Sequence, residues 1–228
     1  MISDRVRPAS REETVAIGQQ LEQRMIQDKP LILGIGGTPR RGSSSERALA
    51  ISLKAAEDKG ARTILLSGAE LLLPIYIPGQ QQSDQASRLL AALRECHGII
   101  ISSPAYHGSI SGLIKNALDY AEELRADARA YLDGIPVGCI ACAGGWQAVG
   151  QTLGALRTIA HSLRGWPTPL GAMLNTSTAL FDVEGNCIDM ATQRQLETVG
   201  HQVIDFVRMQ RLGRQRAPSI PTDARVES

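Results

Sequence analysis

Short apolar segments alternate with longer amphipathic ones along residues 30–211 of this 228-residue chain. Five apolar segments predict strands: residues 31–36, 62–67, 98–103, 136–142 and 169–175. The segments that follow them have the apolar spacing of helices: residues 45–59, 86–96, 113–124, 148–163 and 190–210. Strands that are apolar on both faces are typical of a parallel sheet covered by helices on both sides. The pattern therefore predicts an α/β domain with a doubly wound, five-stranded parallel sheet in the order 2-1-3-4-5.

The two ends of the chain differ in composition from this domain. Residues 1–29 are polar, and the capping-box spacing from Ser10 to Glu13 predicts a helix that runs to about Lys29. Residues 212–228 contain three Arg and two Pro without apolar periodicity, which is typical of a flexible, solvated tail. We therefore expect an N-terminal helical extension over 1–29, one domain over 30–211 and a tail over 212–228.

Composition narrows the classes of partner. The 24 basic and 23 acidic residues nearly balance, which disfavours a dedicated nucleic-acid-binding protein. Only eight residues are aromatic (four Tyr, two Trp and two Phe), too few for a protein that stacks single strands or sugars. No apolar run approaches the ~18 residues of a membrane-spanning helix, and the charged first residues lack a signal-peptide core. A cytoplasmic protein without a membrane partner is expected.

The four cysteines include the pair Cys139-x-x-Cys142, whose spacing invites a metal or redox interpretation. This pair lies in a predicted buried strand, where residues three apart point to opposite faces. One metal ion could not easily bind both thiols, so we expect buried, reduced cysteines and no metal site.

The loop after the first predicted strand has the composition of an anion-binding loop. Residues 34–46 read Gly-Ile-Gly-Gly-Thr-Pro-Arg-Arg-Gly-Ser-Ser-Ser-Glu and lead directly into a predicted helix. Small residues let backbone amides approach an anion, and the helix N-terminus adds the positive end of its dipole. A dinucleotide fingerprint needs a third glycine where Pro39 stands, and a triphosphate loop needs a lysine where Ser43 stands. A terminal phosphate monoester is therefore expected; a serine-rich helix cap with surface arginines is the alternative.

Two further loops each place one aromatic residue among small residues. Residues 102–112 follow the third predicted strand and contain Tyr106, and residues 142–147 follow the fourth and contain Trp146. Such loops allow a planar ring to lie against exposed backbone, whose amides reach the polar edge of that ring. Ordinary loop packing is the alternative for both aromatic residues. Tyr76, which follows the second predicted strand, is a further candidate for the same site.

Two stretches resemble motifs of the NAD(P)H-dependent FMN reductase family. The first, Gly37-Thr-Pro-Arg40-x-x-Ser43, resembles the family's phosphate signature Gly-Ser-x-Arg-x-x-Ser. The second resembles the motif that lines the flavin ring in that family: Pro104-x-Tyr106-x-x-Ser109-x-x-Gly112-x-x-Lys115-Asn116-x-x-Asp119. The resemblance covers about residues 31–175. It implies a flavodoxin-like fold, a homodimer or homotetramer, and transfer of hydride from NAD(P)H to flavin.

The resemblance also implies a set of cofactor-binding residues. The FMN phosphate would be held by Thr38, Arg40, Ser43, Ser44 and Ser45. The flavin ring would lie along Pro104, Ala105, Tyr106, His107, Gly108, Ser109, Ala143, Gly144, Gly145 and Trp146. The sequence departs from the family pattern at Thr38, which keeps the hydroxyl of the usual serine, and at Ser111, which replaces a common proline. Trp146 lies outside the pattern.

Hydride transfer between nicotinamide and flavin needs two planar rings held ~3–3.5 Å apart, and it needs no dedicated acid or base. We accordingly assign no catalytic side chain and no metal ligand. The resemblance implies FMN and NAD(P)H as cofactors, and a partner monooxygenase as a recipient of reduced FMN. Two alternatives stay open: an FMN-containing reductase of quinones, azo compounds, nitro compounds or metal oxyanions, and a flavodoxin-type electron carrier.

Overall fold

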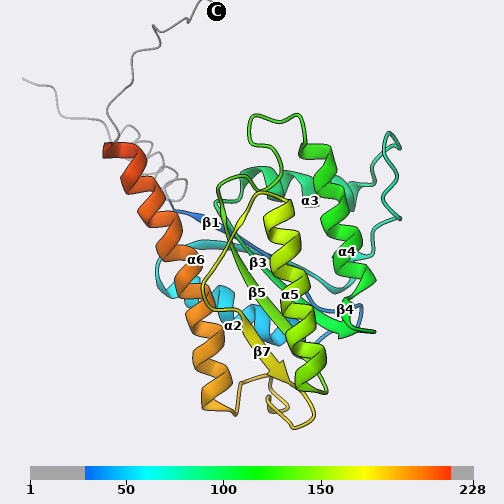
Figure 1. The fold of residues 1–228 in the computed structure, drawn as a ribbon, viewed down its shortest axis with the longest axis vertical. Helices are drawn as coiled ribbons and strands as arrows, with labels where there is room; N and C mark the ends of the chain where they lie inside the picture. Colours follow the sequence, from blue (N-terminus) through cyan, green and yellow to red (C-terminus); the bar gives the residue numbers. More distant parts are fainter. Residues whose placement is uncertain (1–28, 217–228) are drawn as a thin grey trace, which may run out of the picture.

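A computed structural model describes residues 29–216 of the chain (Figure 1). The strands are β1 (Leu31–Gly36), β2 (Arg62–Ser67), β3 (Gly98–Tyr106), β4 (Ser109–Ile110), β5 (Pro136–Ala143), β6 (Trp166–Pro167) and β7 (Ala172–Asn175). The α-helices are α2 (Ser44–Asp58), α3 (Asp84–Glu95), α4 (Gly112–Asp119), α5 (Trp146–Ser162) and α6 (Met190–Arg216). Two 3-10 helices, η1 (Gly68–Leu71) and η2 (Tyr120–Leu124), complete the described elements. The expected helix over residues 10–29 lies almost wholly outside the described residues.

The main strands form the parallel order β2-β1-β3-β5, and β6 and β7 both pair with β5. Because β6 pairs with the start of β5 and β7 with its end, the two together occupy the place of the expected fifth strand. The α/β fold class and its parallel sheet are thus confirmed. The sheet has seven strands rather than five, because the last strand is divided and β4 pairs antiparallel with β3.

The division of the fifth strand has a local cause in residues 168–171. Pro169 lacks an amide hydrogen and cannot donate to β5. Arg157 of α5 donates to the backbone oxygens of Thr168 (3.0 Å) and Pro169 (2.8 Å), so these oxygens bond to a side chain rather than to the sheet. The Thr168 hydroxyl donates to the Leu170 oxygen (3.0 Å) and tightens the same bend.

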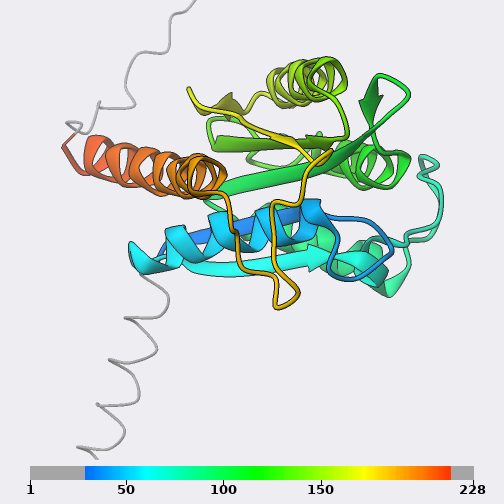
Figure 2. The ribbon, with the colours of Figure 1, turned by 90° about the horizontal axis from the view of Figure 1, so that it is seen from below.

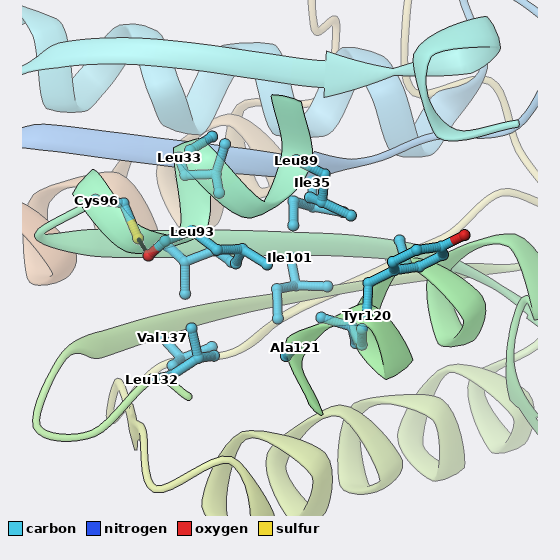
Figure 3. Packing of buried hydrophobic residues seen from close by; sticks show 14 of the residues in the cluster. Leu33, Ile35, Leu89, Leu93, Cys96, Ile101, Tyr120, Ala121, Leu132 and Val137 are labelled. Atoms are coloured by element: carbon cyan, nitrogen blue, oxygen red, sulfur yellow. Dashed lines mark hydrogen bonds between the residues drawn. The ribbon is translucent and has the colours of Figure 1, made fainter. Parts of the chain in front are cut away.

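Alternation along the strands creates two apolar clusters, one on each face of the sheet. Residues such as Leu33 and Ile101 pack with α3, α4 and α5 on one face, and Figure 3 shows this cluster from close by. Residues such as Ile32 and Ile100 pack with α2 and α6 on the other face, where the two helices lie side by side (Figure 2). Full burial of a leucine or isoleucine side chain stabilises the fold by about 1.5–3 kcal/mol, so the two clusters hold the layers together.

The contact between α2 and α6 is unusually close. The Ser52 hydroxyl of α2 donates to the Leu196 backbone oxygen of α6 (2.7 Å), and both residues are buried. A Cβ built on Gly200 would lie 2.1 Å from the Ser52 backbone oxygen, so only glycine allows this approach. Helix α6 continues past Gln210 to Arg216, and the first residues of the expected tail are therefore helical. None of the helices within residues 29–216 is long and apolar enough to cross a membrane.

Substitution of Gly200 tests this close contact. We expect Gly200→Ala to lower the free energy of unfolding by about 1–3 kcal/mol, because the new methyl group overlaps backbone that cannot rotate away. Gly213→Ala is the matched control on the same helix: a Cβ built there meets no atom within 4 Å. That variant should raise the free energy of unfolding by up to about 1 kcal/mol, because alanine favours helix. Urea unfolding measures both, and equal effects would contradict the close contact.

Candidate functional site

The carboxyl ends of β1, β3 and β5 bring three loops to one edge of the sheet. These strands are neighbours in parallel register, with Gly36 opposite Ser102 and Pro104 opposite Cys142. Helix α2 leaves β1 toward one face of the sheet, and α4 follows β3 on the opposite face. The chain therefore diverges between the first two loops, which is where ligands of doubly wound sheets bind.

The first loop joins β1 to α2 through two left-handed glycines, Gly37 (φ 90°) and Gly42 (φ 68°). Ser43 caps α2 by accepting a hydrogen bond from the Glu46 amide (3.3 Å). The hydroxyls of Ser43 and Ser45 are buried and lie 3.3 Å apart, whereas Thr38 donates to the Arg40 backbone oxygen (3.1 Å). The loop thus gathers hydroxyls and a helix N-terminus at one place.

The arginines of this loop have different surroundings from its serines. Arg40 and Arg41 are exposed, and neither forms an ion pair within the described residues. Arg47, one turn into α2, lies beside Gly42 but is engaged: its Nη1 donates to the Asp182 backbone oxygen (2.8 Å). Two positive charges are therefore available beside the loop, and a third is engaged elsewhere.

Glu46 is the residue of this loop that sequence reasoning missed. Its Oε2 accepts a hydrogen bond from the Gly42 amide (2.6 Å), and its Oε1 accepts one from the Ser67 hydroxyl at the end of β2 (2.8 Å). The signal was present, because Ser43-Ser-Ser-Glu46 has the spacing of a capping box. A carboxylate thus occupies part of the loop expected to bind an anion.

The second loop is a tight hairpin between β3 and β4. His107 (φ 51°) and Gly108 (φ 84°) form its turn, and two successive left-handed residues are typical of hairpin turns. The Ser109 backbone oxygen accepts from the Thr152 hydroxyl of α5 (3.3 Å), which ties the hairpin to its neighbour. Tyr106 is 53% exposed beside this turn. The loop after β3 is therefore a hydrogen-bonded hairpin that carries one exposed ring.

The third loop, residues 143–145, is almost free of side chains. A Cβ built on Gly144 or on Gly145 would meet no atom within 4 Å. Gly145 precedes α5 without a side-chain cap, and Trp146, the first residue of α5, is 62% exposed. The backbone at the end of β5 is thus open to a ligand, with an indole ring at its margin.

A model of the family described as NADPH-dependent FMN reductase matches residues 30–179, which is more than half of the chain. The chain belongs to this family. The FMN-dependent NADPH-azoreductase of Staphylococcus aureus (strain USA300) is 33% identical over 111 residues, which cover 48% of this chain and 55% of that protein. The chain thus spans about half the length of the curated relatives it matches.

Solved structures of low sequence identity share the fold. The flavoenzyme FerB, an NAD(P)H:(acceptor) oxidoreductase from Paracoccus denitrificans, superposes with a TM-score of 0.64 at 19% identity over 79% of this chain and 98% of that chain. The apo form of the NADH:FMN oxidoreductase EMOB gives 0.61 at 19% identity, over 85% and 92%. A WrbA-like flavodoxin from Agrobacterium tumefaciens gives 0.55 at 18% identity, over 80% and 99%. The fold is flavodoxin-like.

One departure from the family pattern has a clear structural outcome. Ser111 stands where proline is common, and its side chain caps α4 by accepting from the Ile114 amide (3.3 Å). The Ser111 amide, which proline would lack, donates to the Ser103 hydroxyl (3.0 Å). The start of α4 is therefore held by two hydrogen bonds of Ser111, where a proline would instead fix the backbone with its pyrrolidine ring.

Tyr76 does not join the exposed rings of the three loops. Its ring packs against Tyr120 with centroids 5.1 Å apart, and its hydroxyl donates to Glu123 (2.8 Å). Asn116 accepts from the Tyr76 amide (2.9 Å) and holds the loop after β2 against α4. Partial burial and the bond to Glu123 raise the pKa of Tyr76 to about 12. Tyr76 is therefore engaged in packing by contacts that sequence spacing did not reveal.

The cysteine pair behaves as the strand pattern predicts. Cys139 belongs to the apolar cluster on one face of the sheet and Cys142 to the cluster on the other. Burial raises the pKa of both thiols to about 12. Residues 29–216 contain no group of three or more His, Cys, Asp or Glu side chains placed to hold a metal ion.

A groove of about 800 Å³ lies between the outer face of α2, the turn at residues 184–185 and α6, and it reaches the first loop at Gly42 and Glu46. Its positive groups are already engaged: Arg47 bonds to the Asp182 oxygen, and Lys54 pairs with Asp58. Despite its size, the groove lacks the open backbone of the loops, so we place the functional site at the loops.

Proposed function

We propose that this protein is an NAD(P)H-dependent flavin oxidoreductase that transfers hydride from the nicotinamide to FMN. The observation that carries the proposal is the convergence of three loops at the carboxyl ends of β1, β3 and β5: one rich in anion donors, and two with accessible backbone and an exposed ring. Membership of the NADPH-dependent FMN reductase family supports the same reaction.

The first loop would hold the FMN phosphate through residues that share small size or donor character: Thr38, Arg40, Ser43, Ser44 and Ser45. A phosphate at a helix N-terminus gains from the aligned amides and from the helix dipole. The two left-handed glycines leave the loop backbone without side chains where it turns, and exposed Arg40 adds a charge-assisted contact.

The other two loops would hold the flavin ring along residues 104–109 and 143–146. The open space above Gly144 and Gly145 fits a flat ring, because a side chain at either position would project into it. Tyr106 and Trp146 would border the ring, and His107 lies in the hairpin turn between them along the chain. The residues present thus fit a flavin.

When bound, FMN supplies the ring that takes up a hydride and passes electrons to an acceptor. The protein's own part is to bind, orient and leave one ring face accessible to the nicotinamide. Hydride transfer between two rings held in contact needs no proton to be moved by a side chain of these loops.

For the acceptor we propose that reduced FMN is released to a partner monooxygenase. The names of the curated relatives favour a second candidate, reduction of azo compounds by bound FMN. Affinity separates the two, because a protein that purifies yellow retains FMN as a bound group. A homodimer or homotetramer stays a prediction from the resemblance.

The reaction itself is tested by anaerobic oxidation of NADPH or NADH with and without added FMN. We expect oxidation of the nicotinamide and bleaching of the flavin absorbance in stopped-flow traces, because hydride passes from one ring to the other. Flavin that binds but does not bleach with either nicotinamide would instead favour a flavodoxin-type electron carrier.

A pair of serine substitutions tests the phosphate loop. Ser43 and Ser83 each cap a helix by accepting from the amide three residues later, at 3.3 Å and 3.2 Å. Ser43→Ala and Ser83→Ala should each lower the free energy of unfolding by about 1 kcal/mol. Only Ser43→Ala should also weaken FMN binding, by about tenfold, because it removes a donor to the phosphate. Equal FMN dissociation constants in the two variants would contradict the assignment.

The two tryptophans test the ring site by fluorescence. Trp146 is the first residue of α5 and follows the loop after β5. Trp166 pairs with the first residue of β5, at the opposite end of that strand, and its ring centroid lies 6.0 Å from that of Phe206. We expect FMN to quench the emission of Trp166→Phe strongly, because Trp146 remains beside the flavin. In Trp146→Phe the quenching should be largely lost; quenching that follows Trp166 instead would place the flavin elsewhere.

A further inference from the structure

We infer that Glu46 is an internal competitor for the FMN phosphate and makes FMN an exchangeable ligand. The inference rests on the proposed function and concerns one side chain of its phosphate loop. It addresses whether FMN is retained or released, which the family alone leaves open.

The contacts of Glu46 cross the phosphate loop. One carboxylate oxygen accepts from the Gly42 amide (2.6 Å), and the other accepts from the Ser67 hydroxyl (2.8 Å). The Gly42 amide immediately precedes Ser43, the cap of α2, so it belongs to the group of donors that a phosphate at this helix start would use. Without a ligand, the carboxylate of Glu46 therefore satisfies a donor that a phosphate needs.

No ion pair neutralises this carboxylate within the described residues. The ion pairs of the described chain do not include Glu46. Its neighbour Arg47 lies beside Gly42, with its Nη2 3.5 Å from a Cβ built there, but the guanidinium donates to the Asp182 oxygen (2.8 Å) and forms no ion pair with Glu46. Glu46 thus places one negative charge where the FMN phosphate, with nearly two negative charges, would bind.

Two effects of this arrangement act in the same direction. FMN must displace the carboxylate from the Gly42 amide or do without that donor, and the phosphate must approach a like charge. The affinity for FMN is lowered relative to a loop with a neutral residue at position 46, and release after reduction is favoured.

The test compares FMN and riboflavin binding to the full chain and to Glu46→Gln, Glu46→Ala and Glu57→Gln. Glu57 is the matched control, because it lies near the other end of α2 and its substitution removes the same charge. We expect both Glu46 variants to bind FMN about tenfold more tightly than the unmodified chain, while Glu57→Gln binds it unchanged. Riboflavin, which lacks the phosphate, should bind equally to all four proteins, and added salt should reduce the FMN difference.

Three results would overturn the inference. FMN affinity that is unchanged or weaker in both Glu46 variants would mean that the carboxylate holds the loop ready for FMN and does not compete. A parallel gain for riboflavin would mean that the phosphate is not involved. If the unmodified chain binds no FMN, the proposed function fails together with this inference, whereas FMN binding that Glu46 does not influence leaves the proposed function standing. Thermal unfolding of each variant checks that the fold is retained.

Discussion

A buried hydrogen bond joins the two halves of the site: the Ser102 hydroxyl of β3 donates to the Ser45 backbone oxygen in the first turn of α2 (2.8 Å). Both residues are buried, so water cannot replace either partner, and loss of the bond would leave a buried polar group unsatisfied. It lies where the strand order reverses, between β1 and its neighbour β3. The position of the phosphate loop relative to the loop after β3 depends on this connection.

Glycines allow the layers to approach closely enough for that connection. A Cβ on Gly36 would lie 2.8 Å from the Ser102 backbone oxygen and from a methyl group of Leu49. Because β1 carries glycine at this point, α2 packs directly against the sheet and its first turn reaches β3. Small residues such as Gly36 are part of the pattern that resembles an anion-binding loop. Their direct effect is to let α2 pack closely against the sheet, and this packing positions the loop for an anion.

The sequence predicts the main elements because their patterns are local. Apolar segments such as residues 99–101 specify buried strands, and the residues that cap α2 and α4 lie within three positions of their partners. The divided last strand was not predicted, because it depends on Arg157, which reaches residues 168 and 169 from a different element. The packing of Tyr76 was not predicted for the same reason: its partners Asn116 and Glu123 are 40 and 47 residues away.

Glu46 shows a different limit of sequence reasoning. Its capping-box spacing is local and readable, yet its bond to Ser67 is not, because β2 lies beside β1 only in the folded sheet. From the sequence alone, Glu46 is expected only to cap α2. In the folded sheet its carboxylate also contacts Ser67 of β2 and lies across a candidate anion site.

The aromatic residues of this chain differ in how they are engaged by their neighbours. All eight lie within the described residues, and six are engaged in packing: Tyr76 with Tyr120, Trp166 with Phe206, Phe181 with Arg47, and Tyr131 with Arg164. The remaining two, Tyr106 and Trp146, have no ring or cation contact within residues 29–216; they are 53% and 62% exposed, and Trp166, at the opposite end of β5, is 59% exposed. Exposed rings forgo a large gain from burial, since each could bury 150–250 Å². Tyr106 and Trp146 differ from Trp166 in having no ring partner and in lying on neighbouring loops at the carboxyl ends of β3 and β5, so together they offer the surface that a flat ligand would cover.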